Sequence, residues 1–493
     1  MNYKTIFNII GKVLLLEAAL MLLPLGVSVI YSDGCTDDLL IGAAAAAALG
    51  AVMFLPTRKA GKPLSVRDSL AVAALTWLFA SLAGCLPFLI SGEISSFPDA
   101  FFETVSGFTT TGASILTDVE RMSRSLQFWR SFTHWLGGMG ILVLVTAIAA
   151  GSGDGSTNIL KAEMPGHSLD KFTPKAKNNA KLLYDIYIVL TLLETVLLIA
   201  GGMPVFDSVV HALGTAGTGG FGVRNDSIAS YSPYIQWVVT IFMILFGVNF
   251  NVYFFIYIRK LRDAARCEEM RWYLGIIAAA TVLICANAYD TALTLEHNVR
   301  NSAFQVASII TTTGFATVNF DLWPELSRTI LVMLMFCGAC AGSTGGGLKV
   351  SRFVIAAKSL GNYISTFLHP RAVRKVKFED KDVEPETLRA ILVYFIAVVF
   401  IFAVSVLLVS LDNFDQITNF TAVAATFNNI GPGLNAVGPT CNFAGFSAFA
   451  KCVMIFDMLA GRLEIFPLLM LLYPPLWRES VSEARRRKAR AAR

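Results

Sequence analysis

Four short stretches rich in threonine, asparagine and glycine could together bind a dehydrated cation. They are residues 109–112, 217–220, 311–314 and 428–431, and each ends in glycine. Four such stretches around one axis would form a ring of backbone carbonyl oxygens, which can replace the hydration shell of an ion. Threonine adds a hydroxyl oxygen without charge, and uncharged oxygens suit a monovalent ion, because calcium sites use carboxylates. The sequence therefore predicts a filter for a monovalent cation.

A single stretch of this kind would be explained by a packing contact or a helix cap. Four stretches in register argue against that alternative. The second stretch departs from the others, because Gly217 and Gly219 stand where the third has Thr311 and Thr313, which predicts a looser second side of the ring. The predicted filter residues are Thr110, Thr111, Gly112, Thr218, Gly219, Gly220, Thr312, Thr313, Gly314, Asn429, Ile430 and Gly431.

A glycine-rich segment, residues 338–349, interrupts a long apolar run. It superficially resembles a phosphate-binding loop, but Leu348 stands where that motif requires lysine, and no strand precedes it. Glycines destabilise a helix by roughly 1 kcal/mol each relative to alanine. The segment therefore predicts either a kinked packing site or a mobile plug beneath the filter.

Arg462 lies in the last apolar run, where an arginine is costly unless it faces water or a partner. A structural salt bridge with Glu464 is the alternative, although residues two apart on a helix point to different sides. Three intramembrane acids, Glu17, Glu103 and Glu194, could equally be structural hydrogen-bonding groups or parts of an ion path.

Composition places these motifs in a membrane protein. Of 493 residues, 55% are hydrophobic and 15% are charged, whereas soluble proteins carry about 25% charged residues. Many apolar runs reach the roughly 20 residues that a helix needs to cross a bilayer. The first run lacks a clear signal cleavage site, so we expect it to be a retained span.

The chain carries no pattern typical of an enzyme. It has no acid–base constellation, metal cluster or nucleophile motif, and its five histidines have no ligand spacing. Cys337 and Cys340 form a CxxC inside an apolar run, where small packing residues explain them better than redox chemistry or zinc. We expect no organic cofactor.

Hydropathy predicts an all-α polytopic membrane protein in which two spans precede four repeats of span, short helix, polar link and span. The predicted spans are residues 6–31, 39–55, 70–90, 128–150, 182–202, 234–258, 272–293, 329–357, 388–411 and 446–472. The predicted domains are 1–67 (two N-terminal spans), 68–155 (pore unit 1), 156–265 (pore unit 2), 266–360 (pore unit 3, with a broken last helix) and 361–493 (pore unit 4 and a basic tail).

The four short helices are expected at residues 99–112, 207–220, 301–314 and 418–431. Thirteen residues before each terminal glycine stands a residue type that caps helix N-termini: Asp99, Asp207, Asn301 and Thr418. The last match is the weakest, because Asp415 competes for that cap. Irregular backbone at membrane depth must line water or be buried in protein, so these helices are expected to be re-entrant around a cavity.

Lysine and arginine gather in the links between the units, which predicts one cytoplasmic side. Ten crossings with both termini in the cytoplasm satisfy this pattern. The basic end, residues 485–493, is better explained as a cytoplasmic membrane anchor than as an arm that binds nucleic acid.

The four filters, with Phe221 and Phe315 after the second and third glycines and residues 428–433 in the fourth, resemble the Trk/Ktr/HKT superfamily of potassium transporters. Within it the chain is most similar to TrkH subunits of bacterial Trk systems, over nearly its whole length. The resemblance implies four helix–pore-loop–helix units around one pore, and a homodimer with one pore in each protomer. Related sodium-conducting members replace the first filter glycine by serine, so Gly112 implies potassium as the bound ion.

The resemblance also implies a gate and a partner. The gate would consist of Gly342, Ser343, Thr344, Gly345, Gly346, Gly347, Lys349 and Arg462. A cytosolic TrkA-like ring would carry the nucleotide-binding domains that this chain lacks, and the basic loops either dock it or serve only as topology signals. The implied function is potassium uptake across the bacterial inner membrane. The alternatives are a symporter that couples potassium to protons or sodium, and an integral membrane enzyme.

Overall fold

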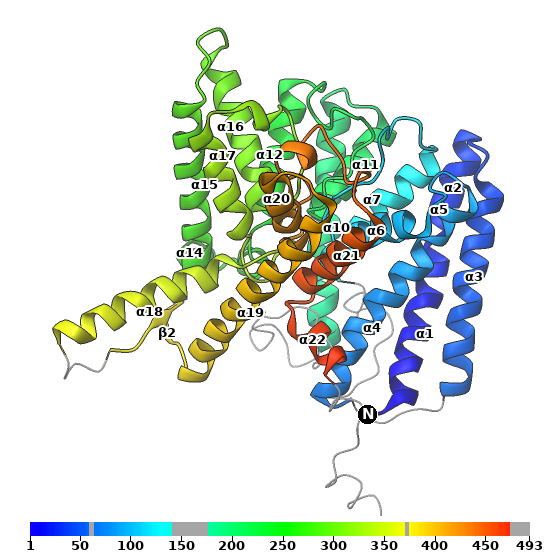
Figure 1. Cartoon of the computed structure of the whole chain (residues 1–493), viewed down its shortest axis with the longest axis horizontal. Coiled ribbons are helices and arrows are strands. Elements are labelled where there is room, and N and C mark those ends of the chain that lie inside the picture. The colour runs from blue at the N-terminus through cyan, green and yellow to red at the C-terminus, as the bar shows by residue number, and fades with distance from the viewer. Residues whose placement is uncertain (59–63, 141–175, 370–373, 474–493) are drawn as a thin grey trace, which may run out of the picture.

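The computed structural model describes residues 1–58, 64–140, 176–369 and 374–473. These residues form an almost entirely α-helical molecule, as hydropathy predicts (Figure 1). Six of their helices are long and apolar enough to cross a membrane, and a seventh span is formed if a bent helix pair is counted as one. The predicted boundary at residues 155–156, most of the basic link around it and the basic tail lie outside the described residues.

The N-terminal spans pack tightly as a pair. They comprise α1 (Tyr3–Leu20), α2 (Leu22–Tyr31), α3 (Thr36–Phe54) and the short 3-10 helix η1 (Leu55–Thr57). Gly11 and Gly50 lie where α1 crosses α3, and a Cβ on Gly11 would come within 2.8 Å of the Gly50 carbonyl oxygen. Small residues allow this close approach of two backbones.

Four units follow, and each contains a short helix that points toward the centre of the molecule. The first comprises α4 (Val66–Gly84), α5 (Leu86–Ile90), the short helix α6 (Phe97–Phe108) and α7 (Arg124–Met139). The second comprises α10 (Ala176–Ala200), the short helix α11 (Val205–Ala216), α12 (Pro233–Phe246), α13 (Phe250–Tyr257) and α14 (Leu261–Arg266).

The third unit comprises α15 (Glu268–Asn287), the short helix α16 (Leu295–Ile310), η3 (Phe320–Leu322), α17 (Glu325–Phe336) and α18 (Val350–Leu368). A small antiparallel hairpin follows, formed by β1 (Lys377–Phe378) and β2 (Lys381–Asp382). The fourth unit comprises α19 (Pro385–Val409), η4 (Ser410–Asp412), the short helix α20 (Gln416–Phe427), η5 (Asn435–Val437), α21 (Ala448–Arg462) and α22 (Phe466–Leu472).

Four of the spans expected to be continuous are each divided between two helices: 6–31 between α1 and α2, 70–90 between α4 and α5, 234–258 between α12 and α13, and 446–472 between α21 and α22. The span expected at 234–258 is α12 and α13, which meet at 91°, because Asn249 starts a new helix by accepting a hydrogen bond from the Asn251 N–H at 2.9 Å. The span expected at 446–472 ends at Arg462, since Glu464 and Ile465 have positive φ values of 53° and 66°. The break expected in 329–357 is present between α17 and α18.

Asp99, Asp207, Asn301 and Thr418 do not cap the four short helices, whereas the competing residue Asp415 caps the fourth. Asp99, Asp207 and Thr418 are the third residue of α6, α11 and α20, and Asn301 lies inside α16. Two of the helices begin earlier because other residues cap them: Thr294 of α16 accepts from the His297 N–H, and Asp415 of α20 accepts from the Thr418 N–H. An acid in the first turn still stabilises the free N–H groups there.

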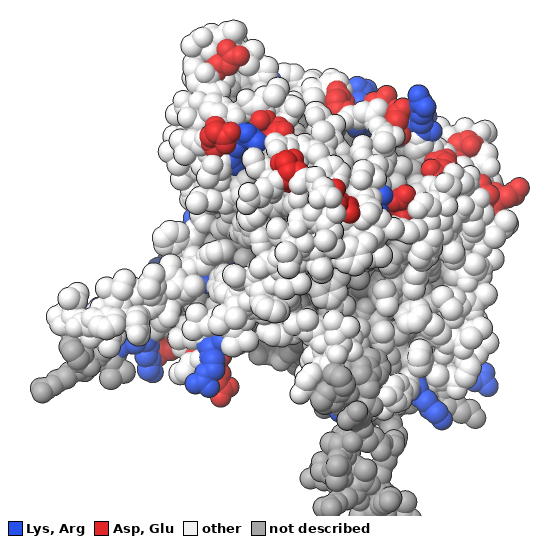
Figure 2. Space-filling view, in the orientation of Figure 1, with Lys and Arg blue, Asp and Glu red and all other residues white. Residues whose placement is uncertain are grey.

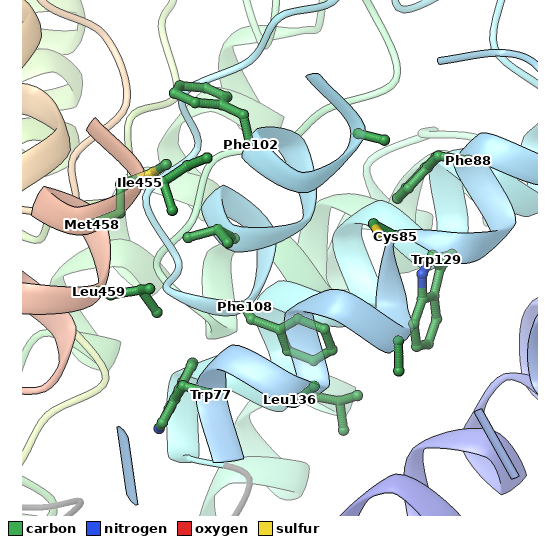
Figure 3. Close-up of a cluster of buried hydrophobic side chains, with 14 of the residues drawn as sticks. Trp77, Cys85, Phe88, Phe102, Phe108, Trp129, Leu136, Ile455, Met458 and Leu459 are labelled. Atoms are coloured by element: carbon green, nitrogen blue, oxygen red, sulfur yellow. The ribbon is translucent and has the colours of Figure 1, made fainter. Parts of the chain in front are cut away.

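The first short helix, α6, lies at the centre of a large apolar core (Figure 3). Trp129 of α7 donates its indole N–H to the Gly84 carbonyl oxygen at 2.9 Å and packs edge-on against Phe108 of α6. Figure 3 shows side chains from α4, α5, α7 and α21 surrounding this helix: Trp77, Phe88, Leu136, Ile455, Met458 and Leu459. The core thus fixes the direction in which α6 points.

The charged side chains divide the surface into two ends (Figure 2). In this view acidic residues gather at the upper end, near the loops that precede and follow the short helices. Basic residues are visible at the lower end, beneath α1, α3, α18 and the hairpin. Lysine or arginine side chains are also visible at the upper end, so the two ends differ in this view by the acids that gather at the upper one.

Candidate cation site

The four short helices end in the same backbone conformation. The residue two before each terminal glycine is left-handed, with φ between 53° and 59°, and each terminal glycine has φ between 75° and 100°. The residues concerned are Thr110, Thr218, Thr312 and Asn429, and Gly112, Gly220, Gly314 and Gly431. A left-handed conformation costs a non-glycine residue roughly 1–2 kcal/mol, so its recurrence at four matched positions indicates one shared backbone path.

Hydrogen bonds repeat in the same register. The N–H of the residue before each terminal glycine donates to the carbonyl oxygen five residues earlier, at 2.8–2.9 Å. These bonds run from Thr111 to Ser106, Gly219 to Gly214, Thr313 to Ser308 and Ile430 to Ala425. Each helix therefore ends in the same turn and directs the negative end of its dipole inward, which favours a cation.

The four turns form a closed ring. A Cβ added to any of the four glycines would lie less than 3 Å from a carbonyl oxygen of the next unit. Gly112 faces the oxygen of Gly219, Gly220 that of Thr313, Gly314 that of Ile430, and Gly431 that of Thr111. The chain thus brings together all four predicted filter segments, and only glycine fits where each touches the next.

One cavity of about 160 Å³ is lined by all four glycines. Its wall includes Arg130, which pairs with the buried Glu103 at 2.5 Å. Glu103 also accepts a hydrogen bond from the Ile115 N–H at 2.9 Å, so it ties the chain beyond the first filter to α6. Glu17 and Glu194 are fully buried on α1 and α10.

Hydroxyl groups brace the first and third filters identically. Thr109 and Thr111 are joined through their Oγ1 atoms at 2.8 Å, and so are Thr311 and Thr313. Asn429 of the fourth filter donates its amide to Thr111 Oγ1 at 2.9 Å, which links the fourth filter to the first.

At the N-terminal end of α20, hydrogen bonds from the Thr418 hydroxyl and N–H lower the pKa of the capping residue Asp415.

The glycine-rich loop packs directly against the ring. Gly346 donates its N–H to Thr312 Oγ1 at 2.7 Å, and Thr218 donates its hydroxyl to the Thr344 carbonyl oxygen at 3.1 Å. A Cβ on Gly346 would come within 2.7 Å of Asn429 Cβ. The loop therefore contacts the second, third and fourth filters. Lys349, which is buried, donates its ammonium to the carbonyl oxygens of Gly345 and Gly346 within the same loop.

Arg462 links the loop to the first unit. Its guanidinium donates to Thr110 Oγ1 at 3.2 Å, to the Thr344 carbonyl oxygen at 2.9 Å, and to the carbonyl oxygens of Gly137 and Gly138 at 2.5 and 2.7 Å. Glu464, the alternative partner of Arg462, forms a salt bridge with Arg352 of α18. Arg462, Gly342, Ser343, Lys349 and the glycines at 345–347 line a small cavity of about 50 Å³.

A carboxylate that the sequence did not single out fastens both ends of the loop. Glu269 Oε1 accepts the N–H of Ala341 at 2.7 Å and that of Ser351 at 3.1 Å. Its other oxygen accepts from the Asn249 side chain at 3.4 Å, at the break between α12 and α13. Glu269 is 2% exposed. In the sequence it lies among arginines and beside Glu268, a pattern typical of a solvated loop.

The break in α12–α13 accommodates this loop. The Cys340 N–H donates to the Gly247 carbonyl oxygen at 3.1 Å, and the Phe250 N–H donates to the Gly342 carbonyl oxygen at 3.0 Å. Cys337 and Cys340 are free thiols. The unpaired backbone groups of the broken helix thus find partners in the loop.

Comparisons with known proteins agree with this architecture. A family model described as TrkH, cation transport protein, matches residues 37–284 and 276–475. The Trk system potassium uptake protein TrkH of Salmonella typhimurium is 36% identical over 489 residues, covering 97% of this chain and 100% of the relative. Its counterpart in Escherichia coli K12 is 35% identical over 488 residues, with the same coverage. The crystal structure of the potassium transporter TrkH from Vibrio parahaemolyticus aligns with a TM-score of 0.87 and 32% identity, covering 97% of this chain and 100% of that one.

Proposed function

The chain belongs to the TrkH family of cation transport proteins, and on that premise we propose that it takes up potassium across the bacterial plasma membrane. Its relatives are transporters rather than enzymes, which removes the enzyme alternative. The observation that carries the proposal is the closed ring, in which carbonyl oxygens of Thr111, Gly219, Thr313 and Ile430 each face a glycine of the neighbouring unit. Such a ring supplies uncharged oxygens to a dehydrated monovalent ion.

In this proposal the ion enters from the acid-rich end, loses water at the filter and passes the loop. The predicted pore units 68–155, 156–265, 266–360 and 361–493 would each contribute one quarter of the filter. Residues 342–347, Lys349 and Arg462 would form a gate, because together they contact all four filters from the inner side. Both termini and the basic links would face the cytoplasm.

Loss of the Glu269 carboxylate is expected to loosen this gate. Replacing Glu269 by alanine removes the acceptor for two loop N–H groups, and a hydrogen bond to a charged group contributes about 1.5–3 kcal/mol. We expect basal rubidium flux from liposomes to rise about fivefold, whereas Glu269→Gln, which keeps an acceptor oxygen, stays close to wild type. The control is Glu268→Ala, since Glu268 pairs with Lys358 and not with the loop. Equal flux in all variants would show that the hydrogen bonds to Glu269 do not hold the loop in its closed position.

We also propose a homodimer and a cytosolic TrkA-like nucleotide-binding ring as partners. Helix α18 projects from the body of the molecule (Figure 1) and exposes an apolar stripe at helical spacing. The stripe consists of Leu360, Tyr363, Ile364, Phe367 and Leu368. An apolar patch of this kind marks a contact with another protein surface or with lipid. The basic lower end would dock the ring.

Charge placed in the α18 stripe is expected to weaken the dimer. Replacing both Ile364 and Phe367 by glutamate should raise the dissociation constant of the detergent-solubilised dimer by about tenfold or more, because interface energy concentrates in a few large apolar side chains. Light scattering coupled to size exclusion measures the change. The matched control is Leu407→Glu with Leu411→Glu, two exposed residues at the far end of α19 and just beyond it. A dimer that survives the α18 change would place the interface elsewhere.

Growth and flux test the function. Expression together with a compatible regulatory subunit should rescue a bacterium that lacks potassium uptake on low-potassium medium. In liposomes, uptake that follows the membrane potential without a proton or sodium gradient supports a channel-like route, and uptake that requires either gradient supports the symporter. Failure of both rescue and flux would contradict the proposal.

A further inference from the structure

The second filter lacks the side chains that brace the first and third. Where those filters have paired threonine hydroxyls, the second has Gly217 and Gly219. The sequence predicts a looser side of the ring at this point. A brace from another segment would be needed to hold the Gly219 carbonyl oxygen in place, and this oxygen is the one that faces Gly112.

The space beside these glycines is filled by His134 of α7. A Cβ on Gly219 would overlap the imidazole ring of His134, and a Cβ on Gly217 would overlap its main-chain carbonyl group. His134 is fully buried. Its ring also stacks on Phe221, the residue after the filter, with centroids 4.1 Å apart and an interplanar angle of 25°. The ring therefore touches the second filter at Gly219 and just beyond it.

Arg130 also packs against Phe221, the residue that follows the second filter. It precedes His134 by four residues on α7, so both side chains lie on one face of the helix. The Arg130 guanidinium carbon is 3.4 Å from the Phe221 ring centroid, and Arg130 is held by Glu103. The imidazole acts at this position through its shape and packing.

We propose that His134 is a specificity-determining residue that braces the second quarter of the filter, in place of the threonine side chains that brace the first and third. This inference rests on the proposed filter. Removal of the ring would leave the Gly219 carbonyl oxygen free to move outward or inward. A ring of oxygens that adapts its size discriminates less between potassium and the smaller sodium ion.

Reversal potentials of the reconstituted protein test the proposal. We expect His134→Ala to lower the potassium-to-sodium permeability ratio about fivefold, which corresponds to about 1 kcal/mol. His134→Gln, which keeps a planar side chain of similar reach, should retain a ratio within about twofold of wild type. Phe128→Ala removes a half-buried ring of the same helix, which packs on Phe132, and should leave the ratio unchanged.

A second pair of variants tests whether the His134 ring occupies the space that a side chain at position 219 would need. Gly219→Ala alone should impair flux, because its Cβ overlaps the imidazole. The double variant His134→Ala with Gly219→Ala should recover flux and selectivity relative to either single change, since the new methyl group fits the vacated space and Gly219 does not have a positive φ. Such non-additivity is the signature of two groups in contact.

The outcomes separate this inference from the proposed function. If the wild type shows no preference for potassium, the proposed function fails. If the wild type is selective and folded His134→Ala is equally selective, only the role of His134 is overturned. Strictly additive effects in the double variant would overturn it as well.

Discussion

Replacing Gly112 by serine is expected to abolish most of the preference for potassium over sodium. A Cβ at position 112 would collide with the Gly219 carbonyl oxygen and also come within 3.7 Å of the Thr313 oxygen. The collision displaces an oxygen that the proposed filter uses, and the φ of +78° at this residue adds strain for any side chain. We expect the permeability ratio to fall by about tenfold or more, equivalent to about 1.4 kcal/mol.

The control for this change is Gly92→Ser. Gly92 has a similar φ of +74°, but nothing lies within 4 Å of the position that its Cβ would take. It therefore carries the backbone strain without the collision. Reversal potentials and competition of sodium with rubidium uptake measure both variants. Gly112→Ser with an unchanged ratio would show that the oxygens around Gly112 do not select the ion.

Replacing Arg462 by alanine is expected to raise basal flux about tenfold. The guanidinium donates hydrogen bonds to the first filter, to the loop and to two carbonyl oxygens at the end of α7. Loss of these bonds frees the loop from the first unit, and each bond to a charged donor contributes about 1.5–3 kcal/mol. Deletion of residues 342–347 should have the same effect, because it removes the segment that contacts the other filters.

Arg462→Lys is the matched control. Lysine keeps the charge but lacks the planar fork that reaches several acceptors at once, so its basal flux should lie between those of wild type and alanine. Rubidium efflux from liposomes without a regulatory partner measures the series, and size exclusion checks that each variant is folded. If neither Arg462→Ala nor the deletion changes flux, the loop is a packing element and not a gate.

The sequence predicted the features that depend on local pattern. The four short polar stretches that end in glycine mark turns whose backbone requires glycine at one fixed position, so Gly112, Gly220, Gly314 and Gly431 could be assigned to these turns without a structure. The helical spans follow from hydropathy in the same way. The start of α16 could not be placed, because Thr294 caps it while other polar residues stand nearby. Asp415, expected only as a competing cap, caps α20.

Features that depend on distant partners could not be predicted. The apolar run that contains α12 and α13 shows no break in hydropathy, and its bend is satisfied by loop residues such as Cys340 and Gly342. Glu269 receives its hydrogen bonds from residues 72 and 82 positions away. His134 is unremarkable in the sequence, because its partner glycines lie in another unit.

Anomalous scattering from crystals soaked in rubidium or thallium would locate the bound ion. We expect ion density on the axis between the carbonyl oxygens of Thr111, Gly219, Thr313 and Ile430, and its loss on exchange into potassium. Density confined to other parts of the molecule, in protein that still transports rubidium, would contradict a filter at these four turns.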